Sequence, residues 1–187
     1  MTEIFRTALP DVIRILPSRF GDHRGFFSET YSQLAYANLG IEAVFVQDNH
    51  SLSAAVGTVR GLHFQVPPHA QAKLVRCGRG AIFDVAVDIR RGSPTYGRWA
   101  GFTLSAENGA QLYIPVGFAH GFATLEPDSE IIYKCSDYYA PETEGALRWD
   151  DSDIGIAWPL TAAPVLSEKD ASAPLLADFN SPCTFEE

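Results

Sequence analysis

Alternation of apolar and polar residues dominates the middle of the chain. In the run AIFDVAVDI (residues 81–89), the odd-numbered positions from Phe83 to Ile89 are all apolar, whereas the even-numbered positions include Asp84 and Asp88. A period of two residues is that of a β-strand. Similar short runs follow at residues 98–104, 111–115, 120–125 and 130–135, separated by segments rich in Gly, Pro, Asn and Asp. This pattern predicts an all-β fold, either a barrel or a double-sheet jelly roll.

Helical periodicity is limited to short segments. The run SETYSQLAYANLG (residues 28–40) predicts a helix that Ser28 caps and Gly40 ends. After about Pro141 the sequence becomes irregular, and residues 166–179 predict a short helix or a tail. There is no repeat, linker or low-complexity tract. We therefore expect one domain spanning 1–187, with an N-terminal arm and an irregular C-terminal tail.

Composition and charge narrow the possible partners. The 187 residues are 46% hydrophobic and 12% aromatic, as in an ordinary globular protein. A formal net charge of −9 argues against nucleic acid as a partner, although local cations could still hold an anionic small molecule. The sequence shows no signal-peptide pattern and no apolar run long enough to span a membrane. Three distant cysteines predict reduced thiols in a cytoplasmic protein and no zinc site.

Two glycine-framed segments resemble the motifs of the cupin superfamily. In the first motif Gly57 and His63 match, but Gln65 replaces the second His, and His69 or Ala70 occupies the place of the Glu. The second motif is matched by Gly109, Pro115, Gly117 and His120, with Thr124 in its last position. The resemblance implies a cupin-type jelly-roll β-barrel with a few short helices.

The usual metal ligands of that scaffold are incomplete. A catalytic transition-metal site needs about three protein ligands and an open position. His63 and His120 remain, and only His69, after two prolines, could complete a set. We therefore expect no metal.

The remaining polar residues suggest acid–base chemistry. His63 lies close in sequence to Arg60 and Lys73, and a neutral imidazole beside a cation can act as a general base; a buried core histidine is the equally weighted alternative. Lys73 is expected to begin a strand that neighbours the one carrying His63. Tyr133 shares a strand face with Cys135 and is either a core aromatic residue or a proton donor. Inversion of a stereocentre requires a base on one face and an acid on the other.

Two arginines beside glycines are candidates for binding phosphate. Arg24 and Arg60 carry planar guanidinium groups that match phosphate geometry, and the alternative is that both are solvated surface residues. The polar run in FVQDNHS (residues 45–51) is typical of a strand end and turn, and could also contact a ligand.

Taken together, seven segments resemble the dTDP-4-dehydrorhamnose 3,5-epimerase family. They are GDHRGFFSE, FVQDNHS, VRGLHFQVPPHAQAKLVR, DVAVDIRRGSPTYGRW, QLYIPVGFAHGFATL, YKCSDYYAPETEGALRWDD and LSEKD, in order from about Asp22 to Asp170. The resemblance implies the substrate dTDP-4-dehydro-6-deoxy-D-glucose and the product dTDP-4-dehydro-L-rhamnose, on the route to dTDP-L-rhamnose for cell-surface polysaccharide. It implies no redox cofactor, because a ketone at sugar carbon 4 acidifies the hydrogens on carbons 3 and 5.

The same resemblance assigns roles to individual residues. His63 is the base, Tyr133 the acid, and Lys73 stabilises the enolate oxygen. Asp170 is expected to orient His63, with Asp84 as the second candidate for that role. The residues implied to contact the substrate are Arg24, Glu29, Gln47, Asp48, Asn49, Arg60, His120, Tyr139, Glu144 and Lys169, with Tyr139 against the thymine. The resemblance also implies a homodimer in which N-terminal strands cross to the partner.

Three alternatives stay open at this point. A relative that epimerises only carbon 3, or that acts on another nucleotide-linked 4-ketosugar, would share these residues. A metal-dependent cupin oxygenase or isomerase is a second class. A non-catalytic sugar-binding cupin is the third, and the retained His, Lys and Tyr disfavour it.

Overall fold

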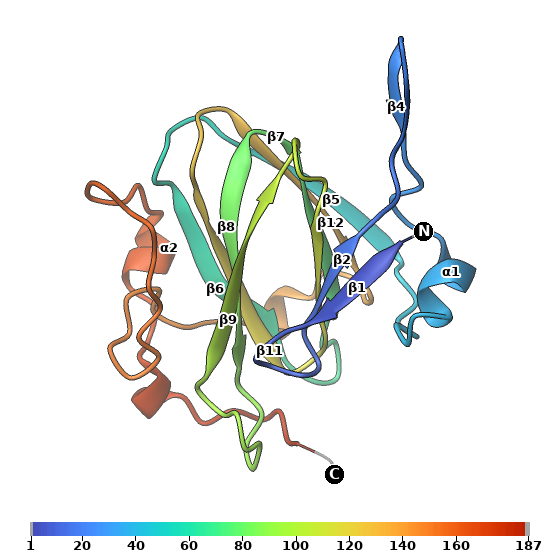
Figure 1. The fold of residues 1–187 in the computed structure, drawn as a ribbon. Coiled ribbons are helices and arrows are strands. Elements are labelled where there is room, and N and C mark those ends of the chain that lie inside the picture. Colours follow the sequence, from blue (N-terminus) through green and yellow to red (C-terminus); the bar gives the residue numbers. More distant parts are fainter. Residues whose placement is uncertain (1, 186–187) are drawn as a thin grey trace.

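The computed structural model describes residues 2–185 and is built almost entirely from antiparallel strands (Figure 1). A six-stranded sheet has the order β1-β2-β10-β7-β12-β5, and a five-stranded sheet has the order β13-β6-β11-β8-β9. The first sheet contains β1 (Glu3–Arg6), β2 (Ile13–Leu16), β10 (Gln111–Ile114), β7 (Lys73–Arg79), β12 (Ser129–Cys135) and β5 (Gln47–Ser53). The second contains β13 (Glu144–Ala146), β6 (Val59–Gln65), β11 (Phe118–Thr124), β8 (Ala81–Asp88) and β9 (Trp99–Ser105).

The two sheets face each other as a jelly roll. Consecutive strands often belong to different sheets, as when β6 is followed by β7 and β10 by β11, so the chain crosses between layers repeatedly. The predicted all-β jelly-roll fold is confirmed. The sheets do not close into a continuous barrel, however, and form an open sandwich.

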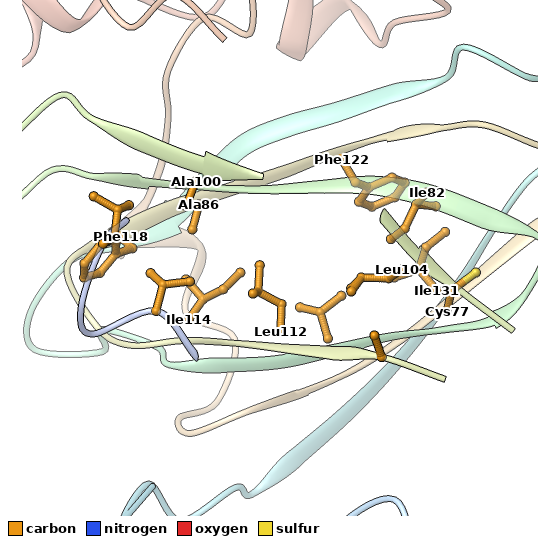
Figure 2. Close-up of a cluster of buried hydrophobic side chains, with 14 residues drawn as sticks. Cys77, Ile82, Ala86, Ala100, Leu104, Leu112, Ile114, Phe118, Phe122 and Ile131 are labelled. Carbon is orange, nitrogen blue, oxygen red and sulfur yellow. The ribbon is translucent and has the colours of Figure 1, made fainter. Parts of the chain in front are cut away.

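Apolar side chains from both sheets fill most of the space between them (Figure 2). The buried members of this cluster are Leu9, Val12, Val75, Cys77, Ile82, Ala86, Ala100, Leu104, Ala110, Leu112, Ile114, Phe118, Phe122 and Ile131. Burial of this apolar surface is the main favourable contribution to folding and fixes the separation of the sheets.

Strand β8 is buried on both faces. Ile82 and Ala86 point into the sandwich, whereas Val85 and Val87 belong to a second cluster on the outer face of the five-stranded sheet. The C-terminal segment covers that outer face through Leu147 and neighbouring apolar residues. The alternation predicted this strand correctly, and both faces of the strand pack against apolar residues.

The helices are short. Helix α1 (Gln33–Ala37) begins at Ser32, whose side chain accepts a hydrogen bond from Ala35 N. The prediction that Ser28 caps this helix was wrong, because the Ser28 hydroxyl instead donates to Ser18 O at 2.8 Å. The C-terminal segment contains α2 (Glu168–Ala171), as expected, and 3₁₀ turns lie at η1 (Pro141–Thr143) and η2 (Leu176–Asp178).

A two-stranded hairpin, β3 (Phe20–Asp22) and β4 (Gly25–Phe27), projects away from the sandwich (Figure 1). Its aromatic residues Phe20, Phe26 and Phe27 are 65%, 61% and 70% exposed. This apolar surface lies outside the buried clusters of the chain. Within residues 2–185, no helix is both long enough and apolar enough to cross a membrane.

Candidate active site

The inward faces of several strands change from apolar to polar. On β12, the core residue Ile131 is followed by the partly buried Tyr133 and then by Cys135. On β7, Val75 is in the core and Lys73 begins the strand. His63, which β6 supplies from the facing sheet, is contacted by Lys73.

His63 is paired with a carboxylate from the C-terminal segment. Its Nε2 lies 2.5 Å from Asp170 Oδ1, across a sequence separation of 107 residues. Asp84, the second candidate partner, does not make this contact. An ionised carboxylate only accepts, so Nε2 of His63 carries a proton in this contact. In the neutral imidazole, Nδ1 then has a free lone pair.

Asp170 sits in a gap along the edge of β6. The edge pairs with the C-terminal segment on either side of the gap, through Val59 N to Val165 O at 3.0 Å and through Leu62 N to Leu147 O at 3.0 Å. In the gap, the backbone of Gly61 donates to the Asp170 carboxylate. Burial acts to raise the pKa of Asp170, but hydrogen bonds from His63, Ser167 and Gly61 outweigh it and hold the pKa below its ordinary value.

A second imidazole–carboxylate pair lies beside the first. His120 on β11 is the register partner of His63, and its Nε2 contacts Asp84 Oδ1 at 2.8 Å. Both side chains are buried, and burial lowers the pKa of His120. The second oxygen of Asp84 has no hydrogen-bond partner among the described residues. The pair therefore places a neutral imidazole and a buried carboxylate in the interior.

Lys73 faces His63 from the opposite sheet. Its Nζ donates to His63 O at 3.4 Å. The expectation that Lys73 lies on a strand neighbouring that of His63 was wrong, because β7 and β6 belong to different sheets. Burial lowers the pKa of Lys73, since the enclosed site disfavours the charged ammonium. A cation held in this position is prepared to stabilise negative charge on a bound molecule.

Tyr133 lies on the sheet opposite His63. On β12 it is the register partner of Asn49 on β5, and the amide of Asn49 contacts Cys135 Sγ at 3.6 Å. Burial raises the pKa of Tyr133, so its phenol stays protonated near neutral pH. The sandwich thus presents an imidazole from one sheet and a protonated phenol from the other.

A second group of predicted residues lies together near α2. Tyr139 Oη and Lys169 Nζ both contact Glu144 Oε2, at 3.1 and 2.7 Å. Burial acts to raise the pKa of Glu144, but the Lys169 contact outweighs it and the pKa is lowered. Gln47 joins this group because its Oε1 accepts from Tyr139 N at 3.1 Å.

Other predicted residues lie elsewhere. Asp48 forms an ion pair with Lys134 at 2.8 Å, in the lining of a cavity of about 300 Å³ that Asn49 and Tyr133 also line. Arg60 is exposed and donates to Ser53 Oγ at 3.1 Å. Arg24 lies at the tip of the projecting hairpin, and Glu29 is exposed in the segment that follows it.

The metal-ligand set of a typical cupin is incomplete in this protein. The Nε2 atoms of His63 and His120 are each engaged by a carboxylate, and Gln65 Nε2 donates to His69 O at 2.6 Å. Across the described part of the chain, no three His, Cys, Asp or Glu side chains form a group suited to a metal ion. The donor set does not fit a transition metal.

Sequence reasoning missed two residues that position this site. The Ser167 hydroxyl donates to Asp170 Oδ2 at 2.8 Å, and the Gln65 side chain joins three backbone groups of the neighbouring loops. The spacing Ser-x-x-Asp in LSEKD is a helix-capping pattern and could have identified Ser167. No signal in the sequence identifies the partners of Gln65.

An open jelly roll with histidine, lysine and tyrosine between its sheets defines a cupin-like protein with an acid–base site. The family model for dTDP-4-dehydrorhamnose 3,5-epimerase matches residues 6–178. The chain belongs to this family, whose members are isomerases.

Individual relatives agree with the family match. The chain is 55% identical over 177 residues to the dTDP-4-dehydrorhamnose 3,5-epimerase of Salmonella typhimurium, covering 94% of this chain and 96% of the relative. The crystal structure of dTDP-6-deoxy-D-glucose-3,5-epimerase from Legionella pneumophila, in complex with dTDP-4-keto-L-rhamnose, matches with a TM-score of 0.95 and 45% identity, covering 100% of both chains. A 3′-monoepimerase from Streptomyces bikiniensis, in complex with dTDP-quinovose, matches with a TM-score of 0.86 and 37% identity, covering 92% of this chain and 87% of that one.

Proposed function

We propose that this protein epimerises dTDP-4-dehydro-6-deoxy-D-glucose at carbons 3 and 5 to give dTDP-4-dehydro-L-rhamnose. The observation that carries the proposal is the opposition of His63, paired with Asp170 on one side of the sandwich, and Tyr133 on the other. A base and an acid that approach a sugar ring from opposite faces invert a stereocentre, whereas a single group returns the proton to the face it left.

The proposed reaction proceeds by proton transfer alone. The ketone at carbon 4 makes the adjacent C–H bonds acidic, and Nδ1 of His63 takes the proton as the electron pair moves onto the carbonyl oxygen. Lys73 stabilises the resulting enolate, and its lowered pKa reflects the enclosed position from which it acts. Tyr133 then donates its phenolic proton to the opposite face of the carbon. His63 then releases its proton to solvent and Tyr133 regains one, after which repetition at the second carbon completes the isomerisation. No oxidant, reductant or metal enters the balance.

The remaining contacts are proposed to hold the nucleotide. Tyr139 is half exposed on the loop after β12, in a position to stack on the thymine. Lys169 and Arg60 supply cations for the diphosphate, and Glu144 exchanges its ion pair with Lys169 for contacts to the ligand. The other proposed contacts are Gln47, Asp48, Asn49 and His120.

We infer that the active protein is a homodimer. The exposed aromatic residues of the β3–β4 hairpin are typical of an interface, because a single domain rarely leaves so much apolar surface in water. Arg24, at the tip of that hairpin, is remote from His63 in its own chain and is proposed, with Glu29, to bind the substrate held by the partner. We also place the protein in the cytoplasm, in dTDP-L-rhamnose biosynthesis for cell-surface polysaccharide.

The decisive experiment is turnover in deuterated water. The purified protein is incubated with dTDP-4-dehydro-6-deoxy-D-glucose, and NMR locates deuterium and the configuration of each carbon. Deuterium at carbons 3 and 5 with both centres inverted supports the proposal. Incorporation and inversion at carbon 3 alone would instead assign a 3-epimerase, the activity in the name of the Streptomyces bikiniensis relative. No incorporation would refute both.

A further inference from the structure

We propose that Ser167 is a positioning residue for the base: its hydroxyl fixes the Asp170 carboxylate in the orientation that holds His63. This inference rests on the proposed function of His63. It adds a third member to the imidazole–carboxylate pair and assigns a task to a residue whose position before α2 otherwise indicates only helix capping.

The two oxygens of Asp170 have separate partners. Oδ1 contacts His63 Nε2 at 2.5 Å, while Oδ2 accepts from the Ser167 hydroxyl at 2.8 Å. The Asp170 N–H in turn donates to Ser167 Oγ at 3.1 Å. Because this N–H occupies an acceptor position on the Ser167 oxygen, the hydroxyl proton is directed toward Oδ2. One serine therefore fixes both the backbone and the carboxylate of Asp170.

Asp170 needs this support because of where it lies. Helix α2 has only four residues, and so short a helix is not stable by its own hydrogen bonds. A further anchor is the ion pair between Lys169 and Glu144 at 2.7 Å, which restrains the helix but does not contact the carboxylate. Rotation of the Asp170 carboxylate would carry Oδ1 away from His63. The Ser167 hydroxyl and the Gly61 backbone oppose that rotation.

The capping and orienting roles of Ser167 can be separated by the choice of variant. Ser167→Gly removes the hydroxyl, yet glycine is well tolerated at a helix N-cap. Ser167→Thr keeps a hydroxyl. Ser172→Ala is the matched control, because the Ser172 hydroxyl donates to Glu168 O at 2.8 Å in the same helix and does not contact Asp170.

The experiment measures turnover of the dTDP-4-ketosugar and the binding of dTDP for each variant. Ser167→Gly is expected to lower kcat about tenfold, the effect of losing one hydrogen bond to a charged group, with KM and dTDP affinity unchanged. Ser167→Thr should restore most of the rate, and Ser172→Ala should behave as the parent. In an Asp170→Ala background, Ser167→Gly should produce no further loss, because its effect passes through that carboxylate.

A measurement without substrate makes the test independent of the proposed function. The imidazole Nε2–H of His63 should give a downfield proton NMR signal in the parent and in Ser167→Thr, and this signal should broaden or move upfield in Ser167→Gly. An unaltered signal, or an equal loss of kcat in the Asp170→Ala background, would overturn the role of Ser167. A parent that keeps the signal but does not turn over the sugar would refute the proposed function alone.

Discussion

His63 and His120 are register partners on adjacent strands, yet each directs its Nε2 to a carboxylate from a different part of the chain. The side chain of His63 is 31% exposed, and that of His120 is only 7% exposed. The more exposed imidazole is therefore accessible to a bound molecule, while burial of the enclosed one lowers its pKa and keeps it neutral. Both histidines are paired with a carboxylate, but the side chain of His63 is more exposed to solvent than that of His120.

Replacement of His63 is expected to abolish proton abstraction without loss of the nucleotide site. His63→Ala should show no deuterium exchange at carbon 3 or carbon 5, a loss of about 10²–10⁴-fold, and calorimetry should show that dTDP binds as it does to the parent. Exchange at the parental rate would show that another group is the base.

Replacement of Tyr133 should separate exchange from inversion. Tyr133→Phe retains the buried ring and removes the proton donor, so His63 can still take a proton and return it to the same face. Solvent deuterium should therefore enter the substrate while inversion falls, most strongly at carbon 5, as measured by NMR. Equal loss of exchange and inversion would contradict a role in proton delivery.

Mixed dimers should reveal which protomer uses Arg24. Suppose that Arg24 binds the substrate held by the partner. A heterodimer of one Arg24→Ala chain and one His63→Ala chain then has one intact site, which takes His63 from the first chain and Arg24 from the second. Mixing the two inactive homodimers, with unfolding and refolding to exchange protomers, should then recover activity. If Arg24 serves its own chain, the heterodimer has no intact site and activity should stay at the level of the separate variants.

The hydrogen bonds to the buried Asp88 carboxylate should make the free energy of unfolding depend on pH. Burial acts to raise the pKa of Asp88, but hydrogen bonds from Arg90, Ser93 and Thr95 outweigh it, so the pKa is lower than its ordinary 3.8. A carboxyl group whose pKa falls on folding stabilises the protein above its unfolded pKa and loses that contribution as the pH falls through the folded value.

Asp88→Asn should therefore lower the free energy of unfolding by about 3–5 kcal/mol at neutral pH, and its deficit relative to the parent should shrink below about pH 4. Urea unfolding across this range provides the measurement. The exposed Asp153 supplies the control, because its side chain makes none of the described hydrogen bonds and Asp153→Asn should change little. A deficit that is constant with pH would rule out the titration of Asp88 as its cause.

Removal of metal should leave activity unchanged. The nitrogen atoms of His63 and His120 that face carboxylates are already engaged, and the donor set does not suit a transition metal. Turnover should survive prolonged dialysis against a chelator. Loss of activity that added zinc, iron or manganese restores would contradict the proton-transfer mechanism.

Local patterns predicted much of the fold. The alternation in residues 81–89 predicted β8, and the glycine-framed segments indicated the jelly roll, because side-chain period and turn residues act over short distances. The start of α1 was misplaced by four residues. Both Ser28 and Ser32 are suitable caps, and only tertiary contacts decide that the Ser28 hydroxyl turns to Ser18.

The candidate site was predictable only in part. Resemblance to a family indicated His63, Tyr133 and Asp170, but spacing along the sequence could not place Lys73 on the opposite sheet. That position depends on how the chain crosses between layers, which is a property of the whole fold. The close contact between Glu144 and Lys169 is likewise set by tertiary packing, since 25 positions separate them in the sequence.

The carboxylate that orients His63 arrives on the segment that follows the last strand of the sandwich. During synthesis, every strand of the two sheets therefore leaves the ribosome before the residues around α2. The carboxylate partner of His63 is the later member of the pair to be made, and a chain clipped before α2 would lack it.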